Sequence, residues 1–578
     1  MATKSVEEIK EQSHSLRGKL AETLQSGVTH FEEEEAQLIK LHGSYQEDDR
    51  DLRVERKRAG LDKAWQFMVR SKIPGGELSS EQYLVHDRMA DELANGTLRL
   101  TTRQGIQLYG ILIGNLKAVI QRINKSGLTT WGACGDVVRN TMSTAIPFSN
   151  PVFRDAQKLS EEISRAFFPK STAYSEIWLD GKKLEDGKED VEEPIYGRHY
   201  LPRKFKIGIA IPPYNDIDFL SQDIALIPHF PKGEVEGYTL YVGGGFGMSH
   251  GQTLTRPFLA QPLFYVKREH VIDACAAVVT TQRDHGRRDD RKQARLKYLV
   301  NSKGIEWFRK EVESRLKAAV EKPRIEHFDS VEDLLGWREQ GDGKWFRGIW
   351  IAEGRIKDTP ENGIRKALRK ICETFKPRLH ITPNCNLYLC DLEAKDKAGI
   401  DAILREFHVP EIESMSKALL MSHACVALPT CGLALAESER VFPQIMDGID
   451  KILRELGLQQ EPILFRMSGC PNGCSRPYNA DFSFVGRAPG KYAFYVGGSH
   501  RGDHLAGLQE KVVAQEEIPS KVRPILENFV KNRTPSEKFS DYWHRTQING
   551  ETPSADQFHV ELAERAARLA GQKVEAQG

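Results

Sequence analysis

The sequence contains no run of 18 or more apolar residues, so we expect no transmembrane helix. Its first 20 residues carry several charged side chains and no apolar segment, which is typical neither of a secretory signal nor of a transit peptide. The net charge over 578 residues is +1, so no overall field attracts nucleic acid or a membrane surface. These absences predict a cytoplasmic protein with no nucleic-acid or membrane partner.

A nucleotide-binding glycine motif is also lacking. The glycine-rich stretch GGGFGMSHG at 243–251 does not fit the GxGxxG pattern and is not followed by a clear helical pattern. No other nicotinamide or flavin fingerprint is present. If the chain is a redox enzyme, its electrons should therefore arrive from another protein.

The rest of the composition is that of a folded protein, with 40% hydrophobic and 28% charged residues. The length predicts three or four packed units. From about residue 65 strand and helix patterns alternate: a strand at 65–73, a helix capped by Ser79 or Ser80, two strands around a polar bend, and a helix ending at Gly127. Residues 181–203 are polar and predict a surface loop, followed by the β-prone run KFKIGIAIPP.

Two stretches recur in the same order in both halves of the chain. RLTTRQGIQLY at 99–109 resembles RLHITPNCNLY at 378–388, with matching ends and with Gln107 aligned to Asn386. GYTLYVGGG at 237–245 resembles GKYAFYVGG at 490–498. The alternative is a chance likeness between strands. We interpret the pairs as a duplicated α/β unit, packed about a pseudo-two-fold axis with a cleft at the interface.

Four of the nine cysteines form a pattern. Cys425 and Cys431 are spaced C-x5-C, and Cys470 and Cys474 are spaced C-x3-C, with 38 residues between the pairs. Structural disulfides are not expected in the cytoplasm, so a metal or redox role gains weight. C-x5-C is a poor zinc spacing, whereas a [4Fe–4S] cluster accepts such spacings. The remaining five are expected to be ordinary buried cysteines: Cys134, Cys275, Cys372, Cys385 and Cys390.

Basic residues concentrate beside several predicted strands. Arg70, Arg103 and Arg139 lie in FMVRSK, LTTRQ and CGDVVRN, and the alternation of LPRKFK places Lys204 and Lys206 on one face. A further run at 280–298 includes Arg283, Arg287 and Arg291; its simplest interpretation is a solvated helix face. Inward-facing cations are costly to bury without an anion. The pattern therefore predicts a polyanionic ligand or an oxyanion substrate.

Taken together, these motifs resemble the assimilatory sulfite reductase hemoprotein family. The resemblance spans roughly residues 10 to 545, in the family's order, and is carried by the cysteine pattern and by LTTRQGIQL, CGDVVRN, YLPRKFKIGIAIPP, LYVGGG, TTQRDHGRRDDRKQARLKY, RLHITPN and SGCPNGCSRP. It implies an α/β (α+β) fold with a duplicated, pseudo-two-fold sulfite/nitrite reductase architecture. In that architecture, ferredoxin-like half-domains accompany mixed-sheet cofactor-binding domains.

The resemblance also implies the cofactors and their contacts. A sirohaem, which carries eight carboxylates, would be coupled to one [4Fe–4S] cluster held by Cys425, Cys431, Cys470 and Cys474, and Cys474 would also be the axial ligand of the sirohaem iron. Arg70, Arg139, Lys204 and Lys206 would surround the substrate and act in catalysis. The implied cofactor contacts are Arg103, Gln107, Arg139, Arg203, Lys204, Lys206, Arg283, Arg287, Arg291 and Asn472.

The same resemblance predicts the domain ranges. Residues 1–60 would be an N-terminal extension, 61–145 and 321–415 the two ferredoxin-like half-domains, and 146–320 a sirohaem-binding α/β domain. Residues 416–578 would form the domain that carries the cluster, the rest of the sirohaem site and the C-terminal helices.

Two positions depart from the family pattern, and the activity has rival interpretations. Tyr109 stands where the family commonly has histidine, and Cys385 where it usually has glutamine or asparagine. The expected reaction is the six-electron reduction of sulfite to sulfide. The alternative is a sirohaem nitrite reductase, but such relatives tend to have a smaller neutral residue at the position of Lys206. A non-catalytic iron–sulfur or zinc protein that binds RNA would need basic and aromatic residues interleaved, which the sequence does not show.

The electron donor is not identified by the sequence. Both a flavoprotein reductase that uses NADPH and ferredoxin serve this family, and the motifs above are shared by members of both types. The oligomeric state is equally open.

Overall fold

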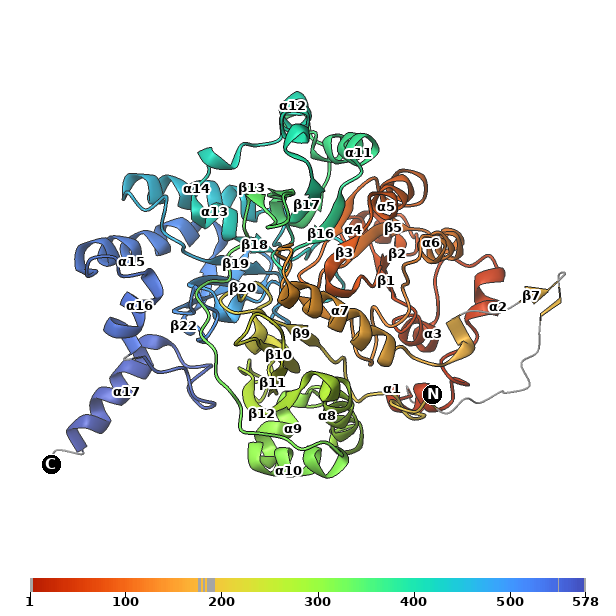
Figure 1. Ribbon diagram of the computed structural model, residues 1–578, viewed down its shortest axis with the longest axis horizontal. Coiled ribbons are helices and arrows are strands. Elements are labelled where there is room, and N and C mark those ends of the chain that lie inside the picture. The colour runs from red at the N-terminus through yellow and green to blue at the C-terminus, as the bar shows by residue number, and fades with distance from the viewer. Residues whose placement is uncertain (1–3, 175–177, 180–181, 184–192, 549, 576–578) are drawn as a thin grey trace.

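A computed structural model describes residues 4–174, 178–179, 182–183, 193–548 and 550–575. Four five-stranded sheets form its framework. In Figure 1 the first ferredoxin-like sheet lies on the right, the second at the top, and the two remaining sheets at the bottom and on the left. Residue 181 and residues 184–192 of the predicted surface loop at 181–203 lie outside the described residues, whereas the described segment 193–203 buries Tyr196, Tyr200 and Leu201. No helix of the described part is long and apolar enough to cross a membrane.

The two ferredoxin-like sheets have equivalent strand orders. The first runs β1-β2-β5-β4-β15, with strands at Ser44–Asp48, Trp65–Arg70, Ile106–Ile111, Leu98–Leu100 and Arg355–Ile356. The second runs β13-β14-β17-β16-β3, with strands at Gly336–Glu339, Trp345–Ile349, Leu387–Leu392, Arg378–Ile381 and Glu77–Leu78. Each sheet therefore takes its last strand from the other half of the chain. This exchange joins the halves at the pseudo-two-fold axis.

The other two sheets are also equivalent to each other. The order β12-β11-β10-β9-β6 uses strands at Gln261–Lys267, Gly237–Val242, Ile224–His229, Ile207–Ile209 and Met142–Ser143. The order β18-β19-β20-β21-β22 uses His423–Ala424, Phe465–Ser468, Phe482–Ala488, Lys491–Val496 and Gly507–Ala514. In each of these two sheets, the three strands that come first in the sequence run parallel to one another, and the last two pair antiparallel with their neighbours. The predicted likeness of 237–245 and 490–498 is confirmed, because these segments contain β11 and β21.

The register of the other repeat was predicted incorrectly. Arg99 pairs with Gln107 in the first hairpin, and His380 pairs with Tyr388 in the second. The turns agree with this register, because Gln104 and Cys385 are equivalent and both have positive φ, 53° and 68°. Gln107 therefore corresponds to Tyr388, not to Asn386, so the sequence alignment is wrong by two residues. A slip of two residues keeps each side chain on its face, so alternation alone could not detect it.

The helices cover the sheets from outside (Figure 1). Predicted boundaries hold where caps are clear: Ser79 accepts a hydrogen bond from the Gln82 backbone at the start of α5. The helices are α1 (Val6–Glu11), α2 (Leu20–Gln25), α3 (Glu33–Leu38), α4 (Arg53–Arg58), α5 (Ser80–Leu93), α6 (Ile113–Lys125), α7 (Pro151–Ala166), α8 (Val271–His285), α9 (Leu296–Lys303), α10 (Ile305–Arg315), α11 (Ile364–Phe375), α12 (Lys397–Glu406), α13 (Lys417–Met421), α14 (Phe442–Glu455), α15 (Ile518–Asn532), α16 (Phe539–Trp543) and α17 (Leu562–Glu575).

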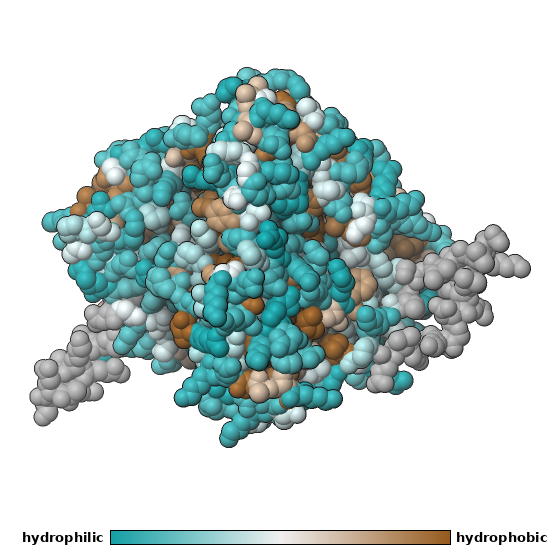
Figure 2. Space-filling model, viewed as in Figure 1, coloured by the Kyte–Doolittle hydropathy of each residue, from teal (hydrophilic) through white to brown (hydrophobic). Residues whose placement is uncertain are grey.

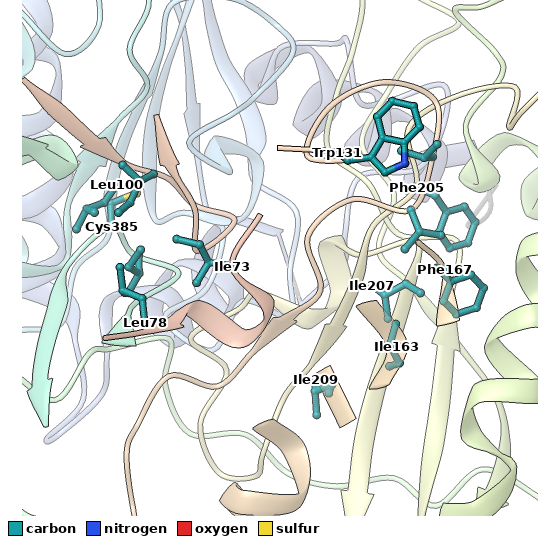
Figure 3. Close-up of a cluster of buried hydrophobic side chains, with 14 of the residues drawn as sticks. Ile73, Leu78, Leu100, Trp131, Ile163, Phe167, Phe205, Ile207, Ile209 and Cys385 are labelled. Carbon is teal, nitrogen blue, oxygen red and sulfur yellow. The ribbon is translucent and has the colours of Figure 1, made fainter. Parts of the chain in front are cut away.

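One large apolar core joins the first three sheets, and a second fills the C-terminal unit. Figure 3 shows part of the first: Leu78, Leu100 and Cys385 meet where the halves exchange strands, while Phe205 and Ile207 pack against α7. The face seen in Figure 2 is mainly hydrophilic, with apolar residues scattered over it. Burial at the exchange holds the hairpins of both halves against the centre of the molecule.

Strand β1 lies within the range 1–60 that was predicted to be an N-terminal extension, and it pairs antiparallel with β2 along Ser44–Asp48. Strand β6 lies within the predicted range 61–145 but pairs with β9. The domain ranges stay a prediction.

Candidate functional site

The four patterned cysteines are brought together by two adjacent parallel strands. β18 ends at Ala424 and β19 at Ser468, and Ala424 pairs with Met467. The chain beyond both strands turns at the same edge of the sheet, where Cys425 donates its backbone N–H to the Met467 carbonyl (3.1 Å). Because carboxyl ends of parallel neighbours meet, residues distant in sequence become one group.

Glycine lets the two cysteine loops pack closely. A Cβ on Gly469 would lie 2.5 Å from the Ala427 Cβ and 2.7 Å from the Ala436 carbonyl oxygen. The Gly469 backbone N–H donates to the Cys425 sulfur at 3.2 Å, and the Asn472 amide donates to the Cys470 sulfur at 3.6 Å. Hydrogen bonds to sulfur of this kind favour the thiolate over the thiol.

Burial and mutual proximity oppose ionisation of these thiols. Burial raises the pKa of Cys470 to about 12, with further increases from Cys474 and Cys425. Burial also raises the pKa of Cys425 and Cys431, and Cys474 adds to each shift. Four thiolates here would need a strongly positive group among them. In the part of the chain that is described, no three His, Cys, Asp or Glu side chains lie close enough for a single metal ion.

Segments from the first half of the chain cover the cysteine loops. The Thr102 hydroxyl donates to the Cys474 carbonyl at 3.1 Å, and the Met248 N–H donates to the Pro471 carbonyl at 2.9 Å. The glycine-rich stretch therefore has a structural role here, because a Cβ on Gly247 would lie 3.3 Å from the Asn472 carbonyl oxygen.

A group of cations lies near Cys474, and two of its members, Arg70 and Lys204, are within electrostatic reach of that thiol. Arg70, at the end of β2, pairs across the sheet with Gln107 of β5. With its amide oriented to satisfy both neighbours, Gln107 accepts from Arg70 Nη2 at 2.6 Å and donates to Tyr109 Oη at 3.0 Å. Burial acts to lower the pKa of Arg70, yet thiol and phenol groups around it, including Cys474, leave it raised overall.

Arg103 and Arg139 enter the same group from two loops. Arg103 donates to the Gln222 side chain (2.9 Å) and to the Ile207 carbonyl (2.8 Å), but its buried Nε has no hydrogen-bond partner. Arg139 donates from Nε to the Gly135 carbonyl at 2.7 Å. Burial lowers the pKa of Arg103 to about 9; Asp223 opposes this shift, and the nearby Arg139 and Arg70 add to it.

Lys204 and Lys206 lie in the extended segment that leads into β9, half-buried, as the alternating pattern predicted. Burial lowers the pKa of Lys204 to about 7, and Arg203 and Arg295 lower it further. Burial also lowers the pKa of Lys206 well below its usual value, and the charges of Arg103 and Lys204 lower it further. Among the described residues no carboxylate lies within salt-bridge distance of either ammonium group.

These observations fit a large anion with several carboxylates. The cations repel one another, and the unpartnered Arg103 Nε and the two lysines have donors to spare. Such a group is stable only with a counter-charge between its members. Cys474 lies within electrostatic reach of Arg70 and Lys204, so the cysteine group and the cation group adjoin.

The basic run at 280–298 divides between the site and the surface. Arg287 is exposed and bound to Asp289, and Arg283 binds Asp284 and the Ile195 carbonyl. Arg291 binds Asp136 at 2.9 Å and so supports the loop that carries Arg139, while Arg203 is half-buried near that same Asp136. The contacts of Arg283 and Arg287 give no support to a cofactor role, which stays a prediction.

The sequence analysis did not single out several buried residues at the site. Arg295 forms an ion pair with both carboxylate oxygens of Asp223. Asp223 also accepts a hydrogen bond from the Lys206 backbone N–H (2.8 Å). Lys297 is buried and donates to the carbonyls of Gly245 and Gly247 (3.1 and 2.8 Å). Both residues lie at the C-terminal end of the basic run. The alternation of Arg295, Leu296 and Lys297 is the sequence signal that could have identified them.

Comparison with known proteins gives matches over nearly the whole chain. A family described as "Nitrite and sulphite reductase 4Fe-4S domain" matches residues 160–320, and "Nitrite/Sulfite reductase ferredoxin-like half domain" matches 62–126 and 338–407. "Sulfite reductase [NADPH] hemoprotein beta-component" of Staphylococcus saprophyticus is 44% identical over 96% of this chain and 97% of its own. The protein of that name from Oceanobacillus iheyensis is 45% identical over 96% of both chains.

A solved structure agrees with the architecture. The "Structure of Mycobacterium tuberculosis NirA protein" is 23% identical, covers 96% of this chain and 97% of its own, and superposes with a TM-score of 0.75. This likeness confirms the predicted fold of duplicated ferredoxin-like half-domains and mixed sheets. The identity and coverage of the two curated relatives settle the family: the chain belongs to the nitrite and sulfite reductase family.

Proposed function

We propose that this chain catalyses the six-electron reduction of sulfite to sulfide, with a sirohaem coupled to a [4Fe–4S] cluster. The observation that carries the proposal is the position of Cys474. It belongs to the group of four cysteines and is at the same time within electrostatic reach of the cations Arg70 and Lys204. A metal cluster and a polyanionic group would therefore adjoin at this residue.

The residues would divide between the two cofactors. Cys425, Cys431, Cys470 and Cys474 would hold the cluster, and Cys474 would also ligate the sirohaem iron. When bound, the pair would pass on the electrons of the donor and provide the iron at which sulfur–oxygen bonds are broken. The proposed contacts to the macrocycle and its carboxylates are Arg103, Gln107, Arg139, Arg203, Lys204, Lys206, Arg283, Arg287, Arg291 and Asn472.

Arg70, Arg139, Lys204 and Lys206 would bind the sulfite dianion through charge-assisted hydrogen bonds. Reduction also consumes protons, because each sulfite oxygen leaves as water. Lys204 suits this task, since a proton donor works best when its pKa lies near the working pH, and its pKa here is about 7. Substrate binding adds negative charge and would raise that pKa, so the ammonium form is favoured as sulfite enters.

Nitrite reduction to ammonia is the second candidate, because the family models that match this chain are described for nitrite and sulfite reductases alike. Lys206 favours sulfite, the bulkier and more highly charged anion. We expect the enzyme to act in the cytoplasm, where cysteines remain reduced.

The donor is inferred from chemistry and from the relatives. Their printed name includes NADPH and calls the hemoprotein a beta-component. NADPH gives two electrons as a hydride, whereas an iron–sulfur cluster accepts one at a time. A flavin on a separate component would connect the two, and ferredoxin is the alternative donor.

The test uses the purified protein, expressed with sirohaem synthesis. We expect a visible spectrum of sirohaem, four cluster irons plus one sirohaem iron per chain, and a higher kcat/KM for sulfite than for nitrite with reduced methyl viologen. A colourless, iron-free preparation would refute the proposal.

A further inference from the structure

Exposed apolar side chains gather beside the first cysteine loop. Leu433, two residues after Cys431, is 66% exposed, and Val54 and Leu61 are 62% and 56% exposed. With Leu52, they make up four of the eleven large apolar side chains that are exposed among the described residues. Such a concentration next to one loop is unusual for scattered surface residues and is typical of an interaction site.

Leu433 and the exposed residues of 52–61 belong to one surface, because Arg50 connects the segment before α4 to the first cysteine loop. Arg50 donates from Nη1 to the carbonyls of Cys431 (3.1 Å) and Ala434 (2.6 Å), and from its backbone to Pro429 (3.2 Å). An ion pair between Asp51 and Arg440 (2.5 Å) adds a second connection. We call the surface formed by 50–61 and 431–434 the α4–Leu433 face.

Helix α4 itself lacks intramolecular cover. It has six residues, Arg53–Arg58, and none of them is buried. A helix this short is marginal in water without packing, and the observed restraints are polar: Arg53 binds Asp48, and Arg56 donates to the Asp62 carbonyl (2.6 Å). Its Val54 points to solvent. The helix therefore offers an apolar side chain that no other described part of the chain covers.

The face is also locally basic. Residues 49–63 contain six basic and four acidic residues, against a net charge of +1 for the whole chain. The last turn of α4 carries Arg56, Lys57 and Arg58, of which Lys57 and Arg58 are exposed. An apolar centre with a basic rim suits a partner whose surface has an apolar centre and an acidic rim.

We infer that the α4–Leu433 face docks the flavin-carrying electron donor through carboxylates that surround the flavin edge. The inference rests on the proposed function, because the face matters for electron entry only if Cys431 holds the cluster. Cys431 is itself part of this surface, and its carbonyl accepts a hydrogen bond from Arg50. Electron-transfer complexes are small and short-lived, so a few apolar and charged side chains are sufficient.

The experiment compares two donors on the same variants. Leu433→Glu and Val54→Glu place a negative charge on the face, and Leu112→Glu is the matched control, since Leu112 is 61% exposed and immediately precedes α6. Sulfite reduction is measured with the flavoprotein component of a curated relative plus NADPH, and separately with reduced methyl viologen, which needs no docking. We expect both face variants to lose at least about tenfold in rate at limiting flavoprotein, as like charges now meet.

The two readouts separate the inference from the proposed function. Unchanged methyl viologen rates in Leu433→Glu and Val54→Glu, with lost flavoprotein rates and a normal Leu112→Glu, support the face. Wild-type flavoprotein rates in Val54→Glu, or an equal loss in Leu112→Glu, overturn it; Val54 is on α4, so this arm does not depend on the cysteine loop. A loss with reduced ferredoxin but not with flavoprotein would overturn the chosen partner. No sulfite reduction by wild type with methyl viologen would refute the proposed function instead.

Discussion

The cysteine loop at 469–476 has an equivalent on the other side of the pseudo-two-fold axis, the loop at 211–218. Both follow the middle parallel strand of their sheet, and both end at a residue with positive φ, Arg476 and Asp218, before a short 3-10 turn. In this register Asp216 stands in the place of Cys474 and Pro212 in the place of Cys470. The same backbone therefore carries cluster ligands on one side only.

The cationic positions of the site likewise have uncharged equivalents on the other side of the axis. Lys206 is equivalent to Leu464: each donates its backbone N–H to a carboxylate, Asp223 or Asp481, at 2.8 and 2.9 Å. Asp223 also binds Arg295, whereas burial without such an ion pair raises the pKa of Asp481 to about 7. The other equivalences, read from strand and hairpin registers, are Arg70 with Gly348, Arg103 with Asn384, and Gln107 with Tyr388.

We call the positions equivalent to the site, Gly348, Asn384, Tyr388, Leu464 and Asp216, the second region. Its own side chains satisfy one another. Arg476 donates to Asn384 Oδ1 (2.7 Å) and to the Pro383 carbonyl (2.8 Å), and Asn384 in turn donates to Asp333 (2.9 Å). Here cations and carboxylates occur together, so no external anion is needed. The duplicated fold therefore places equivalent residues at equivalent points on both sides of the axis. A few differences in side chain decide which side can hold the cofactors.

The largest expected effect is loss of the thiol at the junction. Cys474→Ser should abolish sulfite reduction and uncouple the two cofactors, because a hydroxyl is a poor ligand for cluster iron and for sirohaem iron. Rates with methyl viologen and the visible spectrum measure this. The matched control is Asp216→Asn at the equivalent position, which should keep both colour and rate. Full activity in Cys474→Ser would contradict the bridging role.

Copying the neutral residue of the second region into the first should have the next largest effect. Lys206→Leu, and equally Lys206→Ala, should lower kcat/KM for sulfite by about 100-fold, as loss of one preorganised cationic donor does. Nitrite carries less charge, so its turnover should fall less. Steady-state kinetics with both anions decide, and equal losses would argue against a role in selectivity.

A pH comparison tests Asp216 in the second region. Burial raises its pKa to about 7, Asp333 raises it further, and the Ala145 N–H and Arg476 oppose the shift. An acid with a raised folded pKa stabilises the protein at low pH, and that stability is lost as pH rises from about 4 to about 7. At about 1.4 kcal/mol per pKa unit, the free energy of unfolding should fall by a few kcal/mol.

Asp216→Asn should flatten that fall, because its amide has no charge to bury. Urea unfolding of the cofactor-free protein at pH 4, 5.5 and 8 measures the difference between variant and wild type, so that other titrating groups cancel. An identical pH slope in both proteins would show that Asp216 is not the group responsible.

The sequence was informative where local spacing carries the signal. The C-x5-C and C-x3-C pairs, the strand before Cys470 and the cap at Ser79 were all visible locally, and the resemblance gave the fold correctly. The alternation around Lys204 and Lys206 likewise agrees with the burial pattern, in which a buried Phe205 stands between two half-buried lysines. These features depend on neighbours within a few residues, which a sequence pattern records.

What the sequence could not give depends on contacts between distant segments. The exchange of β3 and β15 between halves, and the pairing of Asp223 with Arg295, join residues far apart in the chain. Charge alone also did not show that Arg287, in the basic run, binds Asp289 at the surface. The hairpin register was wrong because the chance matches at the ends of the repeat outweighed the turn.

Tyr109 offers the smallest and most local test of the comparison. Tyr109→Phe removes the phenol that contacts Gln107 at 3.0 Å and leaves the Arg70–Gln107 pair in place, so kcat/KM should fall only about threefold, as for one hydrogen bond. The control in the second region is Tyr388→Phe, which removes an acceptor of the Leu334 N–H (2.9 Å) and should lower the free energy of unfolding without changing the rate. A loss in Tyr109→Phe as large as that in Lys206→Ala would instead make the phenol a direct participant in proton delivery, and the departure from histidine would then be a functional replacement.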